Sequence, residues 1–165
     1  MTTDLPGGTV PLLFKGTFDF HAIYRASINW MKKYECRVYE PLYKDKISGP
    51  GITEKEIKLL GDVKFDEYLK WTANVTIKVW DAKILPQKGP SGHNLIQGRI
   101  DISIKGELTA DYQKTFEGAG LAANLGKIIN KLFSRGSASQ KIGESYVRIY
   151  ELQDTCKQIL GIETK

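Results

Sequence analysis

The segment Ile100-Asp101-Ile102-Ser103-Ile104-Lys105 decides the fold class of this chain. Every second residue is apolar and the residues between them are polar, so successive side chains point to opposite faces of an extended strand. One face of such a strand is buried and the other meets water. Because a half-buried strand needs a covering layer, the segment predicts a two-layer domain.

Alternating patterns also occur upstream of this segment, at residues 36–44, 54–63 and 68–81. The strongest is 68–81, in which one face carries the apolar residues Ala73, Val75, Ile77 and Val79. Residues 83–98 contain two prolines and three glycines, which indicates a long loop or a ragged hairpin. Strands that follow one another so closely favour an antiparallel sheet, here of four to five strands.

Helical patterns stand at both ends of this strand region. Asp19 is a good N-cap for a helix whose apolar stripe begins at Phe20 and reaches Met31. Residues 121–132 and 142–160 carry two further stripes at helical spacing, separated by a small polar break at 134–140. The sequence therefore predicts an α+β fold with an antiparallel sheet packed against an N-terminal helix and a C-terminal helical pair.

The length of 165 residues fits one domain, and a domain of this size buries roughly 70% of its unfolded surface. We expect a flexible arm at 1–8, a core domain at 9–133, a linker at 134–140 and a C-terminal helix at 141–165. No apolar run is long enough for a membrane span, and the N-terminus does not read as a signal peptide. Cys36 and Cys156 are expected to be free thiols, which favours a location in the reducing cytoplasm.

The residues that could carry chemistry are not grouped in motifs. His21 and His93 have no metal-ligand spacing to other side chains. The loop 89–94 is rich in glycine but lacks the Gly-Lys-Ser/Thr ending of a phosphate loop. No nucleophile elbow occurs, and neither cysteine has a histidine near it in sequence. We therefore expect a protein that is not an enzyme and that needs no cofactor or metal.

Contact with other protein subunits is the function that the sequence favours. Val10 to Phe14 is a short apolar run that could add to the sheet of a neighbour. Exposed aromatic residues often anchor protein interfaces, and the last helix could pack on its own sheet or on another chain. The candidate interface residues are Val10, Leu12, Phe14, Trp30, Tyr34, Trp71, Tyr146 and Ile149.

An RNA- or ribosome-associated role is the alternative. The formal net charge is +5, and Lys127, Lys131 and Arg135 would align along one helical face. Such a stripe is also common on the solvated side of an amphipathic helix. Binding through phosphate contacts would weaken steeply with salt, which separates this alternative from a protein–protein role.

Three stretches resemble small uncharacterised proteins that recur in archaeal and viral environmental sequences. They are Phe18-Asp19-Phe20 with Tyr24 and Trp30, Glu40 to Lys46, and Gly98-Arg99-Ile100 followed by Lys105 to Leu108 and Asp111-Tyr112. The resemblance implies an α+β domain with a helical tail, no known activity, and a place in a larger complex such as a viral particle. A sheet with a long terminal helix is also similar to helix-grip lipid-binding domains, although the order of strands and helices differs.

Overall fold

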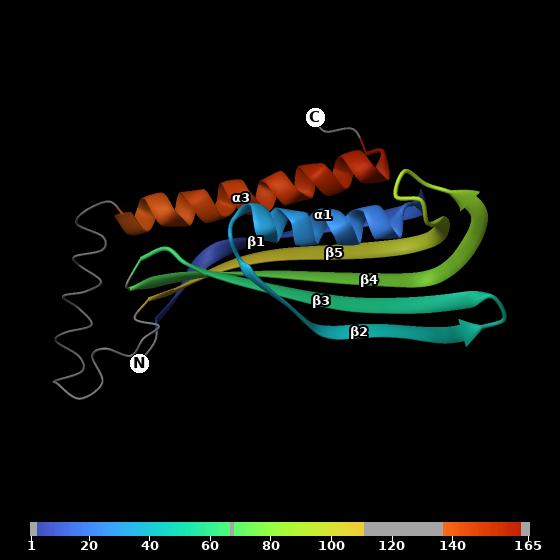
Figure 1. Cartoon of the computed structure of the whole chain (residues 1–165), viewed down its shortest axis with the longest axis horizontal. Coiled ribbons are helices and arrows are strands. Elements are labelled where there is room, and N and C mark those ends of the chain that lie inside the picture. The colour runs from blue at the N-terminus through green and yellow to red at the C-terminus, as the bar shows by residue number, and fades with distance from the viewer. Residues whose placement is uncertain (1–2, 67, 111–136, 163–165) are drawn as a thin grey trace.

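The computed structural model describes residues 3–66, 68–110 and 137–162. Five strands and two helices follow one another along these residues (Figure 1). They are β1 (Thr3–Phe18), α1 (Phe20–Lys33), β2 (Arg37–Gly49), β3 (Ile52–Lys64), β4 (Leu69–Lys88), β5 (Asn94–Ala110) and α3 (Ser137–Leu160). The predicted α+β class with an N-terminal helix is confirmed.

The five strands form one antiparallel sheet in the order β1-β5-β4-β3-β2. Strands β2 to β5 pair with their neighbours in sequence, as the short connections predict. Strand β1 instead pairs with β5, so the first strand closes the side of the sheet opposite β2. The region 83–98 is a hairpin, because β4 continues to Lys88 and β5 begins at Asn94.

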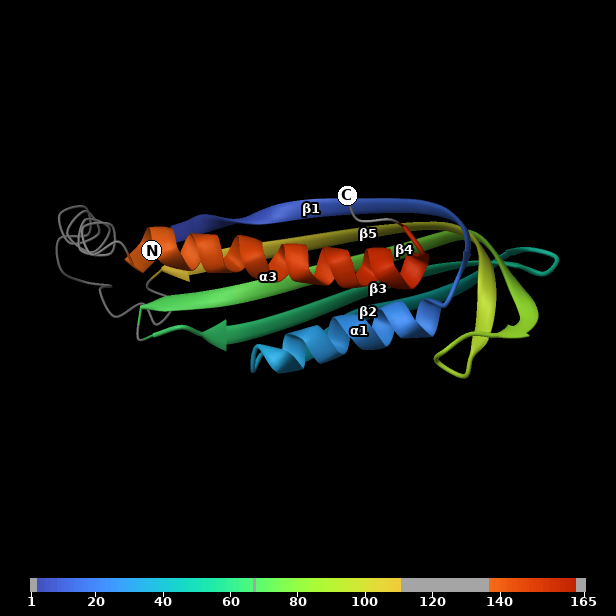
Figure 2. The ribbon, with the colours of Figure 1, turned by 90° about the horizontal axis from the view of Figure 1, so that it is seen from above.

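Both helices cover the same face of the sheet, which we call the inner face (Figures 1 and 2). Helix α3 lies over β1 and β5, whereas α1 lies beside it on the β2 side. The alternating residues of β4 and β5 meet the helices as predicted. Ala73, Val75, Ile77, Val79, Ile100, Ile102 and Ile104 are all buried in the core.

Helix α1 begins as its sequence predicts. The Asp19 carboxylate accepts a hydrogen bond from the Ala22 amide at 3.0 Å, which satisfies one of the unpaired amides of the first turn. Phe20, Ile23 and Met31 are buried against the sheet. Glu35, just after the helix, adopts a left-handed backbone with φ of 59° and turns the chain into β2.

Two predicted boundaries are corrected by the structure. The expectation of a flexible arm at 1–8 is wrong for residues 3–8, because they belong to β1 and pair with β5. A register shift between Pro6 and Thr9 accommodates the Pro-Gly-Gly sequence, which is why that stretch looks like a loop. Helix α3 begins at Ser137, so the second half of the expected linker 134–140 is helical. The predicted helix at 121–132 lies outside the described residues.

The far end of the β4–β5 hairpin bends toward the N-terminus of α1 (Figure 2). The bend coincides with a register shift between Trp80 and Lys83. Asp81 within this bulge has φ of 55°, and its carboxylate forms an ion pair with Arg99 at 2.8 Å. A bulge increases local bending and twist, so this one brings the hairpin loop onto the start of α1.

Two glycines give a matched test of how closely α3 approaches the sheet. A Cβ at Gly106 would lie 2.4 Å from the Ser145 Oγ, whereas a Cβ at Gly143 in α3 would meet nothing within 4 Å. We expect Gly106→Ala to lower the free energy of unfolding by about 1–3 kcal/mol through overpacking. Gly143→Ala should raise it by about 0.5–1 kcal/mol, because alanine favours the helix. Urea denaturation measures both, and a Gly106→Ala variant as stable as the parent would contradict the close packing.

Candidate interaction surface

Helix α3 is joined to the sheet by a buried polar contact. The Ser145 hydroxyl donates to the Gly7 carbonyl in β1 at 2.6 Å and accepts from the Trp71 Nε1 in β4 at 2.8 Å. Ser145 and Trp71 have no exposed surface. A buried hydroxyl and a buried indole N–H each need a partner, and here they satisfy each other across three elements. This contact fixes the position of α3 over the sheet.

A second contact places a cation among aromatic rings. The Arg148 guanidinium carbon lies 4.3 Å from the centre of the Tyr34 ring, 4.7 Å from Phe65 and 4.8 Å from Trp71. Such short distances are typical of cation–π attraction. The Trp30 Nε1 donates to the Arg148 carbonyl at 2.9 Å, which ties α1 to α3.

Glu151 adds charge to the same helix–helix contact. Its carboxylate accepts hydrogen bonds from Lys33 and from the Tyr34 hydroxyl. Burial opposes ionisation of Glu151, but the two hydrogen bonds together with the positive charges of Lys33 and Arg148 lower its pKa. Burial and the Glu151 carboxylate together raise the pKa of Tyr34, so the phenol stays protonated.

Most of the predicted interface residues are used inside the chain. Five are buried in its core, namely Val10, Leu12, Trp30, Trp71 and Ile149. Phe14 and Tyr34 are half-buried against that core. Tyr146 alone among the eight is exposed, at 39%. Of the two arrangements expected for the last helix, the structure shows packing on its own sheet, because α3 folds back and buries Ile149 and Cys156.

Strand β1 is an edge of the sheet, and α3 covers part of that edge. The Gly7 carbonyl accepts from Ser145, and the Pro11 carbonyl accepts from the Gln153 Nε2 at 3.1 Å. Pro6 and Pro11 have no amide proton to offer a further strand. Proline and a covering helix are two ways in which proteins protect a sheet edge from unwanted pairing. The predicted addition of 10–14 to a neighbouring sheet is therefore disfavoured.

Strand β2 is the opposite edge, and no strand lies beyond it among the described residues. A register shift between Tyr39 and Leu42, which includes Pro41, divides its 13 residues into two parts. From Leu42 to Ile47 the pairing with β3 is regular. This second part presents extended backbone to solvent, and its Ile47 side chain is 78% exposed.

The side chains of this part of β2 alternate between the two faces of the sheet. Tyr43 lies on the inner face, where its ring meets Tyr24 of α1 at 6.4 Å. Asp45 on the same face forms an ion pair with Lys55 at 2.6 Å. Lys44 and Lys46 point to the outer face, which the described helices do not cover. We call residues Leu42 to Ile47 the open edge.

Charges alternate across the outer face in line with the open edge. Lys44 pairs in register with Glu56 of β3, Glu56 with Lys78 of β4, and Lys78 with Asp101 of β5. Opposite charges at directly facing positions stabilise a sheet, whereas like charges destabilise it. The row therefore ends at β2 with an exposed positive charge.

The candidate nucleic-acid residues Lys127, Lys131 and Arg135 lie outside the described residues. The sequence reasoning missed the open edge itself. Pro41 was the available signal, because proline inside a strand pattern is confined to edge strands and bulges.

The two histidines lie together at the start of α1, although their sequence spacing gave no sign of it. Their rings stack with centres 3.8 Å apart. Beside them, Asp19 accepts hydrogen bonds from the Ser91 amide at 2.8 Å and the Ser91 hydroxyl at 2.7 Å, which holds the hairpin loop on α1. Burial opposes ionisation of Asp19, but these hydrogen bonds and the one from Ala22 lower its pKa.

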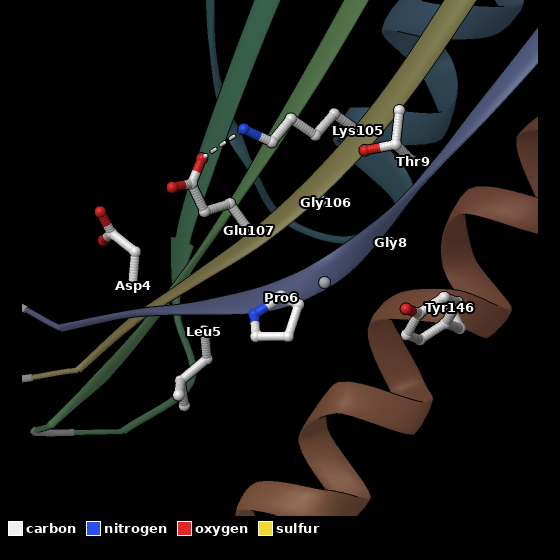
Figure 3. A pocket seen from close by; sticks show the side chains of 10 residues that line it. Asp4, Leu5, Pro6, Gly8, Thr9, Lys105, Gly106, Glu107 and Tyr146 are labelled. Atoms are coloured by element: carbon white, nitrogen blue, oxygen red, sulfur yellow. Dashed lines mark ion pairs between the residues drawn. The ribbon is translucent and has the colours of Figure 1, made fainter.

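Several hollows of the surface are lined by described residues. One, of about 500 Å³, lies at the β1 bulge and is lined by Asp4, Glu107 and Tyr146 among others (Figure 3). Lys105 and Glu107 in its wall form an ion pair at 3.3 Å. Within the described ranges, no three His, Cys, Asp or Glu side chains are placed to hold a metal ion. Neither of the two described helices has the length and apolarity that crossing a membrane requires.

Both cysteines are free, as expected, and buried. Burial raises the pKa of the Cys36 thiol to about 11 and that of the Cys156 thiol to about 12. Thiols with such values stay protonated at neutral pH and are poor nucleophiles.

No protein-family model matches the chain, and no curated protein matches it. Among solved structures, one alignment pairs it with the crystal structure of the di-domain ARO/CYC BexL from the BE-7585A biosynthetic pathway. The sequence identity is 9% and the TM-score is 0.15, with 90% of this chain and 50% of the other chain covered. The chain thus spans about half the length of that protein. So low a TM-score does not show a shared fold, and the pairing carries no argument about function.

The histidine pair makes stability depend on pH. Burial has the largest effect on the pKa of His21 and lowers it, and the positive charge that His93 can carry lowers it further. Asp19 raises this pKa, whereas Lys55 and Arg25 also lower it. Because the folded state then binds the proton more weakly than the unfolded state, stability falls as the pH drops below the ordinary histidine value of about 6.5. We expect His21→Gln to reduce the loss of unfolding free energy between pH 7.5 and 5, a range in which Asp19 stays ionised. Denaturation at both pH values measures this, and an unchanged pH dependence in the variant would contradict it.

Proposed function

We propose that this protein is a non-catalytic assembly or adaptor subunit that works through protein–protein contact, with the open edge of β2 as its contact surface. The observation that carries the proposal is the difference between the two edges of the sheet. Side chains of α3 occupy carbonyls of the β1 edge, whereas the described residues leave the β2 edge bare. An exposed edge is a template to which an extended segment of another chain can add.

Several features support a binding role over a catalytic one. The aromatic and cationic residues of the inner face, Trp30, Tyr34, Trp71 and Arg148, contact each other. Both thiols are buried and protonated. His21 and His93 stack on each other, while the Asp19 carboxylate is occupied by Ser91 and Ala22. These groups act in packing and in fixing the hairpin, and the open edge has the exposed backbone that recognition of a strand uses.

The larger complex that we propose for this subunit, a viral particle or another assembly, rests on the resemblance of the sequence to archaeal and viral proteins. A place in the cytoplasm or within a virion belongs to the same proposal. The RNA- or ribosome-associated alternative depends on Lys127, Lys131 and Arg135, and no contact of the described residues favours it.

Selection from a displayed library of random nonapeptides tests the proposal. We expect the selected peptides to bind as strands at β2, since the backbone groups on the side away from β3 have no partner strand among the described residues. Hydrogen exchange of the complexes should then show slower exchange in 42–47 than in the unbound chain. Residues 10–17 of β1 serve as the internal control and should be unchanged. Peptides that protect another region, or a selection that yields no binders, would contradict the proposal.

A further inference from the structure

The charges and apolar groups of the open edge define the kind of segment that it can accept. Two of its outer-face residues, Lys44 and Lys46, are positive and are two residues apart. No ion pair to either is present among the described residues. A strand added beside them would place alternate side chains directly opposite these two ammonium groups. The complementary residues at those positions are acidic.

The acids of the neighbouring strand do not cancel this preference. Glu56 and Glu54 face Lys44 and Lys46 from β3, one strand further in. Each glutamate would therefore be about 10 Å from an incoming carboxylate, whereas the lysine between them would be about 5 Å away. Charges separated by a Debye length of about 8–10 Å are largely screened at physiological salt. The incoming carboxylate is therefore attracted by Lys44 more strongly than it is repelled by Glu56. It extends the row of alternating charges by one strand.

The inner-face positions of the open edge call for different side chains. Tyr43 is 48% exposed and Ile47 is 78% exposed, so each offers apolar surface to a side chain opposite it. Between them, Asp45 already has Lys55 as its partner. The inner-face residues of the incoming strand that lie opposite Tyr43 and Ile47 should therefore be apolar. Burial of such groups removes apolar surface from water and so stabilises the complex.

A second copy of the same edge is a poor occupant. If two β2 strands paired about a twofold axis perpendicular to the sheet, residues of the same face would lie opposite each other. A register centred on Asp45 would place the two Asp45 carboxylates together and Lys44 opposite Lys46 twice. Registers centred on Lys44 or on Lys46 would each place a lysine opposite itself. Like charges in these positions destabilise the pairing.

We propose that the open edge of β2 binds an extended segment of another protein in which acidic residues two positions apart are flanked by apolar residues, in the order apolar, acid, any residue, acid, apolar. This order is the same in both directions, so it fits an antiparallel or a parallel approach. The inference rests on the proposed function and adds the chemistry of the partner to it.

A capped peptide with the central sequence Val-Glu-Thr-Glu-Val is the probe, and the same peptide with lysine in place of glutamate is its control. We expect the acidic peptide to bind at least about tenfold more tightly, since two facing ion pairs are replaced by two repulsive pairs. Calorimetric titration at 50 and 150 mM salt measures the ratio, which should decrease as salt increases. Equal affinity of the two peptides would overturn the inference about the partner.

Matched variants locate the binding. Lys44→Glu with Lys46→Glu should reverse the preference between the two peptides. Lys15→Glu with Lys83→Glu makes the same change of charge away from β2, on β1 and β4, and should leave the preference unchanged. A double variant at 44 and 46 that still prefers the acidic peptide, with an unchanged far-ultraviolet spectrum, would overturn the assignment of these lysines.

Backbone methylation separates this inference from the proposed function on which it rests. Two versions of the acidic peptide are made, one N-methylated at both glutamates and one at both valines. A strand added to an edge uses alternate amides, so one version should lose binding and the other should retain it. If both bind equally, the peptide is held by charge alone and strand addition fails. If methylation matters but the peptide charge does not, strand addition stands and the acidic partner fails.

Light scattering of the unbound chain should give the mass of a monomer, and a dimer with protected 42–47 amides would overturn the choice of occupant.

Discussion

The arrangement of the helices on the sheet depends on the two hydrogen bonds that the Ser145 hydroxyl makes. The hydroxyl joins α3 to the first strand through Gly7 and to the centre of the sheet through Trp71, three elements that are distant in sequence. Gly106 lies beside this contact, and the absence of a side chain there allows the helix to approach. Because a buried donor or acceptor without a partner costs about 1–3 kcal/mol, the contact also specifies where along the sheet the helix must sit.

The position of α3 determines what the surface can do. Once the helix lies over β1, Arg148 enters the ring cluster formed by Tyr34, Phe65 and Trp71, and the Pro11 carbonyl meets Gln153. One edge of the sheet is thereby covered, and the inner-face aromatic rings contact α1 and α3. The β2 edge has no such cover in the part of the chain that the structure describes. The proposed binding surface is thus a consequence of which edge the C-terminal helix covers.

The sequence predicted the parts of this fold that depend on local periodicity. Alternation in β4 and β5 identified the buried face, and Asp19 marked the start of α1. The aromatic residues were predicted to lie at an interface with another protein, and for Trp30 and Trp71 this prediction was wrong. Periodicity shows which side of a strand is apolar but not what covers that side. Trp71 was expected at an interface and is fully buried under α3. The prolines at positions 6, 11 and 41 do indicate edge strands. Which edge stays open depends on the long-range docking of α3, and no local pattern contains that information.

A double-mutant cycle between Ser145 and Trp71 tests this account most directly. Ser145→Ala removes the acceptor of the buried indole N–H and the donor to Gly7, whereas Trp71→Phe removes the indole N–H itself. Unfolding free energies of the parent, the two single variants and the double variant give the coupling. The account predicts that Ser145→Ala costs less in the Trp71→Phe background, with a coupling energy of about 1 kcal/mol or more. Additive effects of the two substitutions would contradict it, because the hydroxyl would then not join α3 to the centre of the sheet through Trp71.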